Sequence, residues 1–108
     1  MFGDMFGKIQ QMQQEMQALK SRMSNISVAG ESAGGQIKVS VKGNQRVESV
    51  EIGGTLNEWD KEELEDLIMS ATNKAFEQVT KIYEAEMGNL AKQYFPDGVP
   101  PGLMDNMS

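Results

Sequence analysis

The 108-residue sequence predicts a single α+β domain with an N-terminal helix, a three-stranded antiparallel sheet and a long C-terminal helix, in that order. Three patterns lead to this prediction: an unbroken apolar heptad at the start, strand-like alternation between glycine-rich turns, and a long helical repeat afterwards. The domain is predicted to occupy residues 1–95. Residues 96–108 contain three Pro and two Gly and are expected to form a flexible tail.

The first predicted helix runs from about residue 3 to residue 25. Its apolar residues are spaced alternately by three and four for more than three heptads, which is typical of a helix packed along a narrow seam. Most of them are methionines, whose flexible side chains suit adaptable packing. The residues assigned to arm and dimer packing are Met5, Ile9, Met12, Met16, Leu19 and Met23.

Glutamines fill the outer face of the same helix, at Gln10, Gln11, Gln13, Gln14 and Gln17. The simplest interpretation is a solvated helix face. The alternative is a surface that approaches a polyanion, because amides donate hydrogen bonds to phosphates or base edges without charge repulsion. The sequence pattern leaves both interpretations open.

Glycine-rich turns separate three short segments with the alternation of β-strands. In the clearest one, apolar residues alternate with lysine and serine, so that one face is apolar and the other is basic or hydroxylic. In the strand that follows it, Val50 and Ile52 are expected to point inward, whereas Val47 breaks the alternation and allows a β-bulge. The predicted strands are residues 27–32, which is the weakest, 36–42 and 46–52.

A capping pattern marks the start of the second helix at Asp60, which Glu63 follows three residues later. Helical periodicity continues until Pro96 ends it, and about 32 residues of helix are roughly 48 Å long. A compact domain of this length has a radius of gyration of only about 13 Å, so the helix must protrude. Its apolar stripe then needs more cover than one chain supplies, which predicts a homodimer.

The composition excludes most catalytic and metal-binding chemistry. The chain has no His and no Cys, which removes nucleophilic triads, thiol catalysis and ordinary zinc sites. Packing explains the nine Met better than copper(I) binding does, and a helix N-terminus explains the acidic residues 62–66 better than a metal site does. We therefore expect no enzymatic activity, no cofactor and no metal.

The sequence also indicates where the protein resides. No apolar run is long enough to span a membrane, and the start lacks the layout of a secretory signal. We therefore expect a cytoplasmic protein without a membrane partner.

The formal net charge of −6 argues against a polyanionic partner, but acidic residues concentrate in the second half of the chain. Local patches, rather than the total charge, steer a protein toward phosphates. Six basic residues lie beside the seam of the first helix, on one strand face or just after it, and a dimer would present each of them twice. Scattered solubilising charges are the competing interpretation. The candidate phosphate contacts are Lys8, Lys20, Arg22, Lys38, Lys42 and Arg46.

Several short segments occur in an order and spacing that are typical of one protein family. They are QQMQ at 10–13, GES at 30–32, IKVSVKG at 37–43, VEI at 50–52, LEDLI at 64–68, ATNKA at 71–75 and PPG at 100–102. In order and spacing, and over nearly the whole chain, they resemble the YbaB/EbfC family of bacterial nucleoid-associated proteins.

The resemblance implies a tweezer-shaped homodimer, with sheets near the centre and paired helices as arms. It also implies a cytoplasmic, nucleoid-localised protein that binds DNA with little sequence preference and affects nucleoid organisation or gene expression. The alternative is a protein-interaction or chaperone-like module without physiological DNA binding. The acidic net charge favours that alternative, in which the Met-rich seams would grip hydrophobic segments of other proteins.

Overall fold

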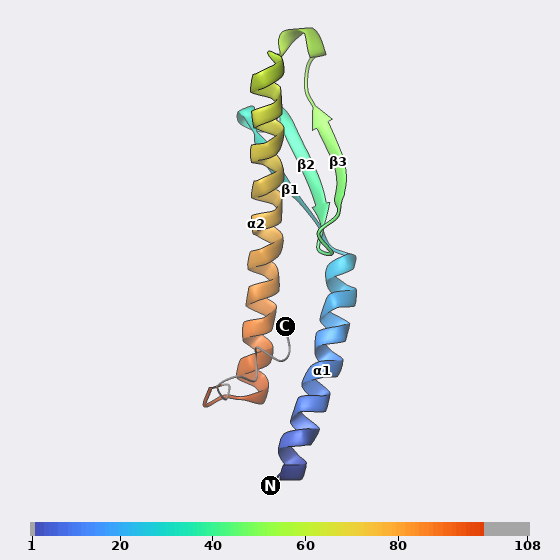
Figure 1. Cartoon of the computed structure of the whole chain (residues 1–108), viewed down its shortest axis with the longest axis vertical. Helices are drawn as coiled ribbons and strands as arrows, with labels where there is room; N and C mark the ends of the chain where they lie inside the picture. The colour runs from blue at the N-terminus through green and yellow to red at the C-terminus, as the bar shows by residue number, and fades with distance from the viewer. Residues whose placement is uncertain (1, 99–108) are drawn as a thin grey trace.

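The computed structural model describes residues 2–98 and has the predicted α+β order of elements (Figure 1). Two short 3-10 helices, Ala33–Gly35 and Leu56–Glu58, lie in the connections. Most of the predicted tail, residues 99–108, lies outside the described residues. The main elements are α1 (Phe2–Ser24), β1 (Ser27–Ser32), β2 (Ile37–Lys42), β3 (Val47–Ile52) and α2 (Lys61–Tyr94).

The molecule is elongated, as the length of the second helix predicts. Its principal extents are 68 × 23 × 19 Å and its radius of gyration is 19.1 Å. α2 begins after the predicted cap, where the Asp60 carboxylate accepts the N–H of Glu63 at 3.3 Å. Its 34 residues are about 51 Å long. The first half of α2 packs on the sheet, and the second half runs antiparallel to α1 to form a two-helix arm (Figure 1).

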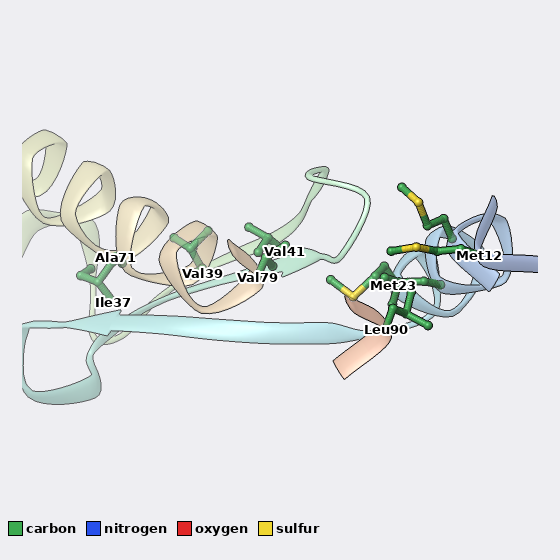
Figure 2. Close-up of a cluster of buried hydrophobic side chains, with 11 residues drawn as sticks. Met12, Met23, Ile37, Val39, Val41, Ala71, Val79 and Leu90 are labelled. Carbon is green, nitrogen blue, oxygen red and sulfur yellow. The ribbon is translucent and has the colours of Figure 1, made fainter. Parts of the chain in front are cut away.

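The apolar heptad of α1 supplies the core of this arm. Four residues of the seam are buried and belong to one apolar cluster with α2 residues such as Leu90 (Figure 2). Nearer the N-terminus, Ile9 is half-buried and Met5 is 47% exposed. The four buried residues are Met12, Met16, Leu19 and Met23. The helices that the structure describes include none long and apolar enough to cross a membrane.

The three strands form an antiparallel sheet in the order β1-β2-β3, and α2 packs on β1 and β2. The apolar face of β2 is completely buried. Small residues on α2, Ala71 and Ala75, let the helix approach the sheet closely. The closest approach is at Gly30 of β1, where a Cβ atom would collide with the backbone of Ala71 and lie 2.6 Å from the nitrogen of Ala75. Glycine at this position is therefore a requirement of helix–sheet packing.

β3 differs from the prediction in its burial. Val50 pairs with the buried Val39 of β2 and so faces the helix side of the sheet, yet it is 46% exposed. The prediction for Val50 is right in direction and wrong in burial, because α2 lies over β1 and β2 rather than over β3. Ile52, at the end of the strand, is half-buried.

The predicted irregularity in β3 is confirmed as a β-bulge. Ser40 pairs with Ser49, but the next residue of β2, Val41, pairs with Val47. Glu48 is therefore the extra residue of the bulged strand. The bulge restores Val47 to the face of the sheet on which Val50 lies.

Candidate nucleic-acid interface

The end of α1 meets the turn between β2 and β3 (Figure 1), and four of the six candidate bases lie near the end of this helix or beside this turn. Gly43 in that turn donates its N–H to the carbonyl oxygen of Ile26 at 3.0 Å, and a Cβ atom on Gly43 would collide with the backbone of Met23. These contacts fix the turn against the end of the helix. The four residues, termed the junction bases, are Lys20, Arg22, Lys42 and Arg46.

The other two candidates lie apart from the junction. Lys8 is about 18 Å from Lys20 along the axis of α1. Lys38, near the start of β2, has Glu31 of β1 and Glu51 of β3 as its cross-strand neighbours. Such facing pairs of opposite charge stabilise a sheet, so Lys38 lies among carboxylates rather than on a basic face. Alternation within one strand does not reveal its neighbours, which is why the sequence pattern missed this arrangement.

Two of the junction bases form ion pairs at exposed positions. The guanidinium of Arg22 lies 3.6 Å from the carboxylate of Glu86 on α2, and the ammonium of Lys42 lies 3.9 Å from that of Glu48 on β3. Exposed pairs of this kind contribute roughly 0–1 kcal/mol, so a phosphate can compete for either base. Within residues 2–98, the other two junction bases have no carboxylate at ion-pair distance.

One flank of α1 is used for packing within the arm. Lys8, Glu15 and Arg22 recur at seven-residue intervals on this flank. The hydroxyl of Tyr94 on α2 donates to the Glu15 carboxylate at 2.8 Å, and this hydrogen bond raises the pKa of Tyr94. Together with the ion pair of Arg22, this contact turns the flank toward α2. Lys8 is the one member of this column that is exposed without a side-chain partner among the described residues.

The junction lies away from the acidic end of the molecule. Residues 58–66, where α2 starts, contain six carboxylates and one lysine. Residues 2–98 as a whole contain ten bases and fifteen acids, so segment 58–66 carries their entire net charge of −5 and the remainder is neutral. α2 starts at the opposite end of the sheet from the β2–β3 turn (Figure 1). The strongest concentration of negative charge therefore lies at the end of the sheet opposite the junction (Figure 1).

A hollow of about 570 Å³ opens between α1, the β2–β3 turn and α2. Its floor is apolar, because Met23 and Val79 are almost completely buried, and its rim is polar. The sequence did not predict it, since its walls come from three distant segments that no local pattern connects. The residues that line it are Lys20, Met23, Gly43, Asn44, Gln45, Val79, Thr80, Tyr83 and Glu84. In the part of the chain that the structure describes, no group of three or more His, Cys, Asp or Glu is placed to hold a metal ion.

An elongated helix–sheet–helix chain with a basic junction and an acidic far end defines a class of small binding proteins. Comparison with known families makes the assignment specific. The profile of the YbaB/EbfC DNA-binding family matches residues 1–94, and the chain belongs to this family. The resemblance noted in the sequence is thereby confirmed.

The chain is also similar to individual proteins over most of their length. The chain is 37% identical over 101 residues to a nucleoid-associated protein of Hahella chejuensis, covering 94% of this chain and 91% of the relative. It is 36% identical over 103 residues to a nucleoid-associated protein of Flavobacterium johnsoniae, covering 95% and 93%. The fold is similar to the crystal structure of an uncharacterized protein from Helicobacter pylori, with a TM-score of 0.73, 26% identity and coverage of 83% of this chain and 96% of that one.

Proposed function

We propose that this nucleoid-associated DNA-binding protein acts as a homodimer that contacts DNA phosphates through its junction bases, with little sequence preference. The observation that carries the proposal is the match to a DNA-binding family over residues 1–94. The names of the two relatives support a location on the nucleoid, within the cytoplasm, and a role in nucleoid organisation or gene expression. Family and relatives are described by DNA and the nucleoid rather than by a reaction, and the protein is not an enzyme.

The charge distribution supports the junction as the phosphate-binding surface. Outside the acidic segment 58–66 the described chain is neutral, so DNA can approach the junction without strong repulsion. Lys20 and Arg46 are the bases most available to phosphates, because Arg22 and Lys42 exchange a carboxylate for each phosphate they bind. Contacts of this kind release counterions, and the affinity should therefore fall steeply with salt.

A gel-shift titration at low salt with duplex DNA of mixed sequence tests this proposal. We expect binding at micromolar protein, and we expect the Lys20→Glu/Arg46→Glu variant to bind about tenfold or more weakly and to show a shallower salt dependence. The control is Lys61→Glu at the acidic end, which makes the same change of charge as either of the two substitutions made alone. If Lys61→Glu weakened DNA binding as much as the double variant does, the junction would not be the contact surface.

The same titration separates the proposal from the chaperone-like alternative. No DNA retention by the unmodified protein at low salt, together with suppression of the aggregation of an unfolded client protein, would favour that alternative. Lys38→Glu gives a further check, since this lysine lies between carboxylates and its reversal should change the affinity for DNA little.

The uncovered side of β3 supports the homodimer. Val47 and Val50 are 51% and 46% exposed on the side of the sheet that α2 covers elsewhere, and Met69 of α2 is 59% exposed. Apolar side chains exposed in a row beside an open strand are typical of a protein–protein contact. A second copy that packs on β3 would bury them. Sedimentation that finds a folded monomer of 11.9 kDa at micromolar concentration would refute the homodimer.

A further inference from the structure

The hollow at the junction combines an apolar floor with a rim of mixed polarity. Met23 and Val79 form the floor, with relative exposures of 3% and 2%, and the half-buried ring of Tyr83 lines one side. Its volume of about 570 Å³ falls within the range of about 300–1,000 Å³ that is usual for ligand sites. The hollow is therefore large enough for a ligand with one flat apolar group.

The rim carries hydrogen-bonding groups of both kinds. Lys20 and Glu84 line the hollow from different helices without forming an ion pair, and the exposed amides of Asn44 and Gln45 line it from the turn. Inside the hollow, the carboxylate of Glu84 disfavours a phosphate that carries no base, and the polar rim disfavours a purely apolar ligand. A nucleobase satisfies both requirements, because its faces are apolar and its edge carries donors and acceptors.

The turn that carries the two amides is held rigidly. The N–H of Gln45 donates to the carbonyl oxygen of Lys42 at 2.9 Å, and the N–H of Lys42 donates to that of Arg46 at 2.8 Å. Gly43 packs against the end of α1 so closely that no side chain fits between them. Because the walls are already in place, a ligand would lose little of its binding energy in ordering the site.

We infer that the hollow binds one unpaired nucleotide, with the base on the Met23 and Val79 floor beside Tyr83 and the phosphate directed toward Lys20. Guanine is the base that fits best, since its N1–H and N2–H groups can donate to Glu84 while O6 and N7 accept from the amides of the turn. This site goes beyond the proposed contact with duplex phosphates, because it requires a base outside the helical stack. The nucleotide can come from an unpaired stretch of DNA or from the free nucleotide pool.

Fluorescence anisotropy with short single-stranded oligonucleotides tests the inference on the full chain. One strand contains thymine throughout, and the other carries a single central guanine. We expect the guanine strand to bind about fivefold or more tightly, which is the lower end of the discrimination that a pair of hydrogen bonds to one base provides. Competition by dGMP identifies the free nucleotide as a ligand, and a preference for the guanine strand that dGMP does not abolish identifies the unpaired base in DNA.

The key variant is Glu84→Gln, with Glu77→Gln as its matched control. Glu77 lies two turns earlier on the same face of α2 and does not line the hollow. Both variants remove one negative charge, so both should bind any DNA strand slightly more tightly, but only Glu84→Gln should lose the preference for guanine. Tyr83→Leu should weaken binding of both strands about fivefold or more.

Equal affinity for the two strands, together with no binding of dGMP, would overturn the inference. So would a Tyr83→Leu variant that leaves nucleotide binding unchanged and shifts the sedimentation coefficient, because a second copy of the chain would then occupy the hollow. The result is separable from the proposed function, since duplex binding should depend on Lys20 and Arg46 and be unaffected by Glu84→Gln beyond the change seen with Glu77→Gln.

Discussion

The two edges of the sheet are treated differently by the rest of the chain. At the β1 edge, the carbonyl oxygen of Ala29 accepts a hydrogen bond from Gln78 Nε2 at 2.8 Å, and that of Glu31 accepts one from Lys74 Nζ at 3.2 Å. Both donors come from α2, so the helix covers the face of β1 and closes its edge as well. Along β3, no side chain of the described residues donates to an outward backbone group.

In the homodimer that we propose, this difference separates a surface used for folding from one used for assembly. Unpaired strand edges invite pairing with other chains, and natural proteins usually block them. Here the same helix blocks one edge and leaves the other open beside exposed valines. The β1 edge should therefore control the stability of each chain, whereas the β3 edge should control the association of two chains.

The largest effect is expected at the contact between β1 and α2. Gly30→Ala places a Cβ atom against the backbone of Ala71, and the resulting shift of the helix should lower the free energy of unfolding by about 3 kcal/mol. Gly88→Ala is the matched control, because no atom lies within 4 Å of its added Cβ. In the interior of α2 it should instead stabilise the protein by about 1 kcal/mol. Urea denaturation of both variants measures the contrast, which fails if Gly30→Ala is as stable as the unmodified chain.

A smaller effect, on association rather than on stability, is expected at β3. Val50→Glu places a carboxylate in the exposed apolar row, and it should weaken dimerisation about 100-fold, or about 2.8 kcal/mol. The chain should still fold, since Val50 is 46% exposed. Ser49→Glu, one residue earlier and on the opposite face of the sheet, is the control. Sedimentation equilibrium that finds the same association for both variants would rule out this face as the dimer contact.

The smallest effect is expected from opening the β1 edge. Lys74→Ala/Gln78→Ala removes two exposed hydrogen bonds and should cost about 1 kcal/mol of stability, because exposed hydrogen bonds contribute little net energy. Gln93→Ala removes a similar amide from α2 without a described backbone partner and should be neutral. Thermal unfolding compares them, and light scattering reports whether the opened edge now aggregates. A double variant indistinguishable from Gln93→Ala on both measurements would show that α2 does not protect β1.

The sequence predicted the elements well because each has its own period. The heptad of α1, the alternation of β2 and the Asp60 cap are local patterns, and the structure bears out all three. Cover is not local. The alternation of β3 predicted the direction of Val50 correctly. It could not reveal that α2 covers β1 and β2 and leaves β3 exposed.

The candidate site was less predictable for the same reason. Lys38 was grouped with Lys42 because they share a strand face, but the register places Lys38 between Glu31 and Glu51. The gathering of bases at the junction, and the hollow beside it, depend on contacts between segments that are distant in sequence. A strand-pairing register derived from the sequence would have revealed the two carboxylates beside Lys38, but not the hollow at the junction.

The contact between Gly43 and Met23 fixes the point at which the arm leaves the sheet. α1 has 23 residues and is about 34 Å long, so a difference of about 10° in its direction at this contact would displace its far end by about 6 Å, which is the width of the minor groove of DNA. The buried seam with α2 holds that direction along the arm. A glycine that neither lies on the arm nor needs to touch DNA therefore helps to determine where the end of the arm lies.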